Sequence, residues 1–186
     1  TLDTSSVLYS GLVSGDTFNG SYTGAFSNAN VGTGKTVTIT SSYSGADSGN
    51  YSVTDQSSTT ADISTKALTA TASASNKTYD GGTTATTTLT FTGLVGSETL
   101  GQTVGSTFDN KNVGSNKSVS VNSITLTDGS GLAANYSINA GQTTTANITA
   151  KSLTVSGITG INKVYDGNTV VTLDSSSVTY SGLVSG

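Results

Sequence analysis

Hydrophobic and polar residues alternate along short stretches of the chain, and glycine, asparagine and aspartate separate these stretches. A period of two turns one face of an extended segment toward a core and the other toward water, which is typical of a half-buried β-strand. No window has the sustained apolar stripe of a helix. The pattern predicts an antiparallel all-β chain with strands at 68–72, 88–91, 118–121, 124–126, 136–138 and 145–148.

Two all-β architectures fit this pattern. We expect tandem small antiparallel β domains of the immunoglobulin-like sandwich type, because short alternating strands are separated by turn residues at close intervals. The alternative is a β-grasp-like fold with one short helical turn, for which 93–100 is the best place.

The chain contains an internal repeat of about 85 residues. The recurring segments, as first and second occurrence, are 76–83 and 162–169, 26–37 and 108–119, and 50–68 and 135–153. A repeat of this length exceeds a solenoid unit, so each one is expected to be a domain with a core of its own. We call them the first repeat (1–65, incomplete and lacking its opening strand), the middle repeat (66–151, complete) and the last repeat (152–186, only the start of a repeat).

The two ends of the chain are related. Residues 1–15 and 172–186 are identical at 13 of 15 positions, and residues 152–171 correspond to the part that the first repeat lacks. An isolated hairpin is marginally stable, so we do not expect 152–186 to be ordered alone. We expect head-to-tail complementation, in which residues from about 152 onward of one chain complete the sheet begun at 1–65 of the next. A chain end that folds back onto its own start is the alternative.

Composition narrows the classes of function. The net charge is −4, from 7 Lys and 11 acidic residues, and His, Cys, Met, Trp, Pro and Arg are absent. No Ser-His-Asp triad, cysteine nucleophile or ordinary zinc site can be built from these residues, so we expect no enzyme. An acidic chain with few cations neutralises phosphates poorly, which argues against nucleic acid as a partner. No apolar run reaches the roughly 18 residues of a membrane span, so we expect no membrane insertion.

Five motifs recur in a fixed order. They are G-L-V-S-G-D-T at 11–17, N-V-G-x-x-K-x-V at 112–119, A-N-Y at 134–136, I-x-x-K-x-L-T at 148–154 and N-K-x-Y-D-G-x-T at 162–169. Together they resemble the YDG repeat domain of large bacterial surface and secreted proteins, including filamentous-haemagglutinin-like adhesins. The resemblance implies an extracellular, bacterial cell-surface location and a structural role as a stalk or fibre. It also implies that the partners are neighbouring repeats or identical chains joined head to tail.

The motif residues suit structural roles. Asp80-Gly81 and Asp166-Gly167 are expected to form turns, in which Asp bonds its own backbone and Gly supplies a positive φ. Lys35 and Lys117 are expected to be solvated charges at a sheet edge. The aromatic residues expected to anchor the small cores are Tyr79, Tyr165, Phe26, Phe108, Tyr51 and Tyr136.

The residues leave open one alternative for a bound ion and one for the function. We expect no cofactor; calcium is the alternative that the Asp-containing loops leave open, although no D-x-D-x-D run or EF-hand pattern occurs. The alternative function is an adhesive module whose repeats bind glycans or a host surface directly. Exposed rings would form the sugar-stacking platform, and the candidates are Tyr9, Tyr22, Tyr43 and Tyr180.

Overall fold

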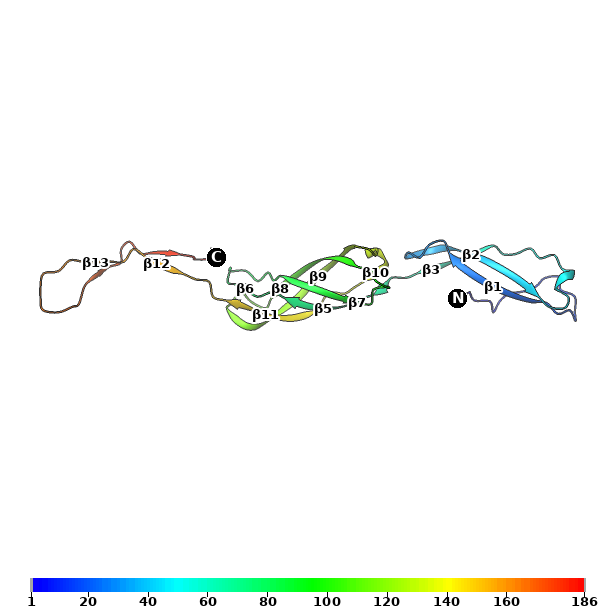
Figure 1. Cartoon of the computed structure of the whole chain (residues 1–186), viewed down its shortest axis with the longest axis horizontal. Coiled ribbons are helices and arrows are strands. Elements are labelled where there is room, and N and C mark those ends of the chain that lie inside the picture. Colours follow the sequence, from blue (N-terminus) through cyan, green and yellow to red (C-terminus); the bar gives the residue numbers. More distant parts are fainter. Residues whose placement is uncertain (1, 186) are drawn as a thin grey trace. The chain divides into compact units, whose positions relative to one another are not determined.

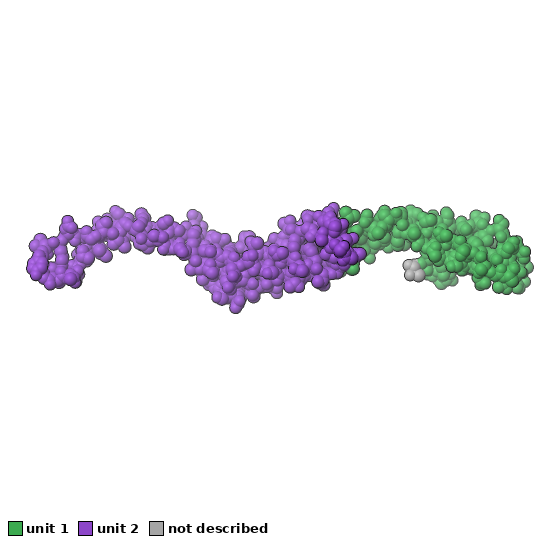
Figure 2. Space-filling view, in the orientation of Figure 1, with its two compact units in different colours: residues 1–67, 132–137 green, residues 68–131, 138–186 purple. Residues whose placement is uncertain are grey.

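The computed structural model describes residues 2–185. Their regular secondary structure is almost entirely β-strand, so the predicted all-β class is confirmed. Figure 2 shows two compact units. Unit 1 contains the described residues up to Ala67 together with Leu132–Ser137; unit 2 contains Leu68–Gly131 and the described residues from Ile138 onward.

The helical content of the described residues is limited to two 3₁₀ turns, η1 (Ser48–Asn50) and η2 (Ala133–Asn135). The helical turn expected at 93–100 is a β-turn instead, closed by a hydrogen bond from Glu98 N to Val95 O, with Gly96 at φ +56°. Gly96 adopts the left-handed conformation, which does not continue a right-handed helix. The arrangement is therefore one of layered small sheets, without the helix that a β-grasp fold lays across its sheet.

The middle repeat has two layers in unit 2 (Figure 1). The larger layer is a four-stranded sheet in the order β6 (Lys77–Thr78), β11 (Thr143–Thr149), β9 (Gly114–Asp128) and β8 (Leu100–Phe108). The smaller is the hairpin of β5 (Thr69–Ala74) and β7 (Thr87–Thr92), which we call the opening hairpin. The pairs are antiparallel except that β6 runs parallel to β11, a departure from the purely antiparallel expectation.

The core of the middle repeat lies between these layers. Phe108, Val119 and Ile148 from the large sheet are 3%, 0% and 1% exposed. Ala85, between β6 and β7, is buried in the same cluster, and Ala74 of β5 and Tyr79, which follows β6, pack against it. Part of this small core therefore comes from residues 68–92, and the sheet alone cannot bury its apolar face.

Unit 1 reproduces the large sheet but not the opening hairpin. Its strands β1 (Asn19–Phe26), β2 (Gly32–Ser44) and β3 (Ser58–Ile63) are the counterparts of β8, β9 and β11. The register is the same, because Phe26 faces Val37 as Phe108 faces Val119. Yet Phe26 is 39% exposed where Phe108 is 3% exposed, since no opening hairpin covers it.

The last repeat forms an isolated opening hairpin, contrary to the expectation that it would not be ordered alone. Its strands are β12 (Thr154–Ser156), β13 (Thr159–Gly160), β14 (Leu173–Asp174) and β15 (Thr179–Ser181). Val155 pairs with Tyr180 as Ala70 pairs with Phe91, so the register matches that of β5 and β7. Nearly all its residues are exposed, and in Figure 1 it projects from the sheets of unit 2. Within residues 2–185 none of these strands pairs with β1, β2 or β3.

Replacing Phe108 with Ala is expected to destabilise the middle repeat by about 3–5 kcal/mol, the usual cost of removing a buried phenylalanine ring. Phe26→Ala is the matched control, because the same residue type at the same register position is already partly exposed, and a smaller loss is expected. Urea denaturation followed by circular dichroism measures both. Equal losses would show that the opening hairpin does not protect Phe108.

Candidate functional site

A lysine holds the turn of each N-K-x-Y-D-G motif. Lys77 Nζ lies 2.7 Å from Asp80 Oδ1 and donates to the Gly82 carbonyl at 2.8 Å, while Gly82 N donates to Asp80 Oδ1 at 2.9 Å. The last repeat has the same arrangement, with Lys163 Nζ 2.7 Å from Asp166 Oδ1. Gly81 and Gly167 have φ values of +83° and +77°, a conformation that glycine adopts at little cost. The lysine-clamped turn forms in the middle repeat, where a packed domain surrounds it, and also in the last repeat, where none does.

The tyrosine of this motif, in contrast, depends on the rest of the domain. Tyr79 N donates to Thr149 O at 2.8 Å and its ring packs on the core of the middle repeat. Tyr165, expected in a core, is 94% exposed, because the last repeat has no large sheet on which the ring could lie. A local hydrogen-bond pattern forms the turn, but a tertiary contact is needed to bury the ring.

The clamps lower the pKa values of their carboxyl groups. The hydrogen bond from Lys77 and that from the Gly82 amide hold the pKa of Asp80 below its ordinary value. Lys163 and the Asn168 amide lower the pKa of Asp166 in the same way. Each clamp therefore favours the ionised carboxylate.

The lysine of the N-V-G-x-x-K motif is also a turn clamp, so the expectation that Lys35 and Lys117 are solvated edge charges is wrong. Lys117 is 9% exposed; its Nζ lies 2.9 Å from Asp109 Oδ1 and 2.7 Å from Asn110 Oδ1. Lys35 Nζ reaches the equivalent Asn28 Oδ1 at 2.6 Å.

The A-N-Y motif of the middle repeat lies in unit 1, where it contacts the first repeat. Val31 N donates to Asn135 Oδ1 at 2.9 Å, and Asn135 Nδ2 donates to Asn30 Oδ1 at 3.1 Å. Next to it, β10 (Tyr136–Ser137) pairs in parallel with β4 (Lys66–Ala67), and Tyr136 is 6% exposed. We call this contact the asparagine lock. Sequence reasoning singled out Tyr136 as a core anchor but did not foresee the role of its neighbour Asn135.

The first repeat carries the same motif in a different setting. Asn50 is exposed. Tyr51, expected as a core anchor, is half-buried; its hydroxyl donates to Asp16 Oδ2 at 2.5 Å and accepts a hydrogen bond from Val13 N at 3.0 Å.

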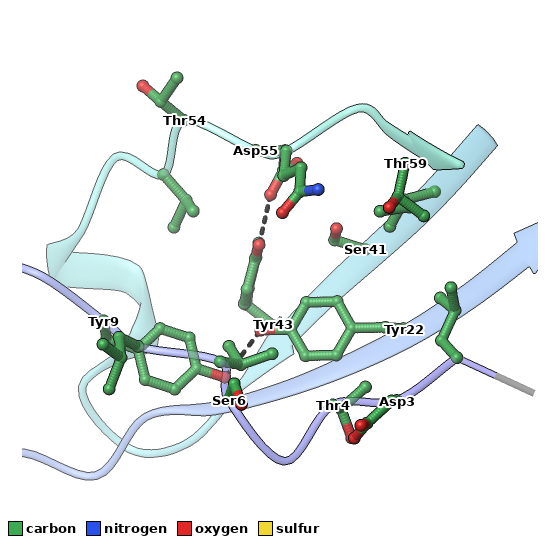
Figure 3. A pocket seen from close by; sticks show the side chains of 16 residues that line it. Asp3, Thr4, Ser6, Tyr9, Tyr22, Ser41, Tyr43, Thr54, Asp55 and Thr59 are labelled. Atoms are coloured by element: carbon green, nitrogen blue, oxygen red, sulfur yellow. Dashed lines mark hydrogen bonds between the residues drawn. The ribbon is translucent and has the colours of Figure 1, made fainter. Parts of the chain in front are cut away.

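A cavity of about 430 Å³ opens on the face of unit 1 (Figure 3). Three of the four tyrosines considered for sugar stacking line it, namely Tyr9, Tyr22 and Tyr43. The fourth, Tyr180, is 56% exposed on β15, in unit 2. Leu2, Val7, Ile39 and Val53 supply apolar walls.

The tyrosine hydroxyls of this cavity are engaged with one another and with a carboxylate. The hydroxyls of Tyr9 and Tyr22 lie 2.8 Å apart, and that of Tyr43 donates to Asp55. The first contact raises the pKa of Tyr22, and the second raises that of Tyr43. The rings of Tyr22 and Tyr43 meet edge to face, at 79°, so they do not present one flat stacking surface.

Among residues 2–185, no three His, Cys, Asp or Glu side chains gather closely enough to hold a metal ion. The same residues include no helix that is both long and apolar enough to cross a membrane.

These features define a class of protein: small all-β domains repeated in series, with lysine-clamped turns and a contact between successive repeats. A family model described as YDG domain matches residues 1–61 and 64–146, which is more than half of the chain, and the chain belongs to this family. No curated protein and no solved structure matches it.

The clamp at Asp80 predicts that the stability of the middle repeat depends on pH. Because its pKa is lowered in the folded state, the ionised carboxylate stabilises the fold fully above its ordinary pKa, and this stabilisation is lost as the pH falls through the lower, folded value. We expect the melting temperature of the middle repeat to fall on acidification below about pH 4, and less steeply in Asp80→Asn. Asp166→Asn is the matched control and should leave this melting transition unchanged, since its clamp supports no packed core. The clamp assignment is contradicted if wild type and Asp80→Asn respond identically to acid.

Proposed function

We propose that the chain is a structural repeat segment, a stalk or fibre, of a long extracellular bacterial adhesin-like protein. Its repeats join head to tail, and it has no enzymatic role. The YDG domain family membership provides the module, and the contact between the first and middle repeats provides the means of joining modules in series.

The asparagine lock is the observation that carries this proposal. A flexible linker alone would leave neighbouring repeats independent of each other. Here Asn135 of one repeat satisfies a backbone amide of the preceding repeat, and two short strands pair beside it. The Asn135 side-chain amide both accepts and donates a hydrogen bond, so it fixes the register of the two repeats as well as holding them in contact. A fixed register suits a module that must extend in one direction.

The surface chemistry agrees with this role. Charged residues make up only 10% of the chain, and Ser and Thr fill about a third of it. Four of the seven lysines are used in clamps, so few positive charges are left to recruit anionic partners. Such a surface is hydrated by hydroxyl groups, and its hydration depends little on salt.

The junction is tested by removing the asparagine lock. Asn135→Ala leaves the Val31 amide without its acceptor, and we expect about 1–3 kcal/mol less protection of that amide from hydrogen exchange. Asn50→Ala is the matched control: it removes the same residue from the first repeat and should leave Val31 unchanged. Unaltered Val31 exchange in Asn135→Ala would refute the lock.

The stalk role is tested against direct adhesion. When the chain is placed between a cell-surface anchor and a tip domain of known ligand, binding should require the tip, and a Gly/Ser linker of equal length should give less reach. The chain alone, applied to a glycan array, should bind nothing. Glycan binding that Tyr22→Ala abolishes would favour the adhesive alternative instead.

A further inference from the structure

The turn between β8 and β9 gathers three side chains of complementary reactivity. Lys117 Nζ lies 2.7 Å from Asn110 Oδ1 and 2.9 Å from Asp109 Oδ1. Asn110 Nδ2 in turn donates to Asp109 Oδ2 at 3.1 Å. One carboxylate therefore contacts the lysine nitrogen through one of its oxygens and the amide nitrogen of the neighbouring asparagine through the other.

The lysine nitrogen is held close to the carbonyl carbon of the Asn110 side chain. The Lys117 side chain is 9% exposed, so few other positions are open to its Nζ. A C=O bond is about 1.2 Å long, so Nζ lies within about 4 Å of Asn110 Cγ. A shift of less than about 1 Å brings the two atoms to the near-attack distance of roughly 3–3.5 Å. Lys117 is therefore placed to act as a nucleophile toward this carboxamide.

The carboxamide itself is polarised for such an attack. Asn112 N donates to Asn110 Oδ1 at 3.0 Å, the same oxygen that Lys117 contacts. A backbone N–H aimed at a carbonyl oxygen stabilises the negative charge that develops there when a nucleophile adds to the carbon. The turn thus supplies a nucleophile, an electrophile, an oxyanion donor and a carboxylate.

We propose that Lys117 and Asn110 form an intramolecular isopeptide bond and that Asp109 transfers the protons. Asp109 Oδ1 takes one proton from the Lys117 ammonium group, and the neutral amine adds to Asn110 Cγ. The Asp109 carboxyl group gives this proton to Asn110 Nδ2, the Cγ–Nδ2 bond breaks, and ammonia leaves. The surplus proton on the newly bonded lysine nitrogen passes to the Asp109 carboxylate and on to water. No oxidant, reductant or second substrate is needed.

Asp109 is in the right ionisation state to begin this sequence. The hydrogen bond from Lys117 holds the pKa of Asp109 below its ordinary value, so the carboxyl group is ionised and can accept a proton. Its two oxygens face the two nitrogens between which the proton moves. The same group can therefore act first as a base and then as an acid.

The first repeat has the same lysine and asparagine but lacks the carboxylate. Lys35 Nζ reaches Asn28 Oδ1 at 2.6 Å, and Asn30 N donates to the same oxygen at 3.1 Å. Ser27 stands at the position of Asp109. The first repeat is thus a control within the same chain, because only the group that transfers protons is missing from it.

The bond closes the turn between β8 and β9 covalently. When the middle repeat unfolds, residues 110–117 remain a ring and cannot extend, which lowers the conformational entropy of the unfolded chain. The inference goes beyond the proposed stalk role and does not depend on it, because the bond lies within one repeat.

The test is the intact mass of the purified full chain after prolonged incubation. The wild type should be lighter than its sequence by one ammonia molecule. Trypsin should then fail to cleave after Lys117 and should release one branched peptide that joins residues 78–111 to residues 112–151. Cleavage after Lys35 should stay complete, since Ser27 cannot replace the carboxylate.

Two variants separate this bond from a cyclic imide of asparagine, whose formation also releases ammonia. Lys117→Arg keeps the positive charge but removes the attacking amine, and Asp109→Ser copies the first repeat. Both variants should keep the full mass of their sequences. The proposal is overturned if the wild type keeps its full mass, if either variant loses ammonia as the wild type does, or if Asn28 and Lys35 become cross-linked as well.

Discussion

The structure depends on one constraint: a small sheet of this protein buries its apolar face fully only when a second layer covers it. The chain is poor in large apolar residues, and its middle repeat buries a small core built around Phe108, Val119 and Ile148. A core of this size loses much of its burial when one layer is missing. This is why Phe108 is buried in the middle repeat while its counterpart Phe26 is partly exposed in unit 1, where no opening hairpin covers it.

Lysine side chains hold the turns of this protein by hydrogen bonds, a role that a larger hydrophobic core would otherwise have. Lys77, Lys117 and Lys163 each bind an aspartate and at least one further oxygen of a turn. An isolated surface ion pair contributes little, but an ammonium group with three oriented acceptors holds a loop in one conformation. The clamps shape the turns that present Tyr79 and its counterparts. The asparagine lock gives the first and middle repeats a defined contact, and this contact is the physical basis of the proposed stalk.

Much of this could be predicted from the sequence. Alternation located β5, β7 and β11, and the Asp-Gly pairs marked the turns, because both signals are local. Strand β8 was missed, since Gly101 and Gly105 interrupt its alternation; both sit opposite residues of β9 at positions where a Cβ would collide with Thr127 or Ser123. The exposure of Tyr165 and the role of Asn135 depend on residues distant in sequence, which no local pattern reports.

The most direct test of the account is the exchange rate of the Asn147 amide in Asn76→Ala. Asn147 N donates to Asn76 Oδ1 at 2.7 Å, a partner supplied by the segment between β5 and β6. If this segment holds the large sheet of the middle repeat, the substitution should speed the exchange of Asn147, while the exchange of Asp62, its counterpart in unit 1, should stay the same. Unchanged Asn147 exchange would contradict the claim that the opening segment completes the sheet.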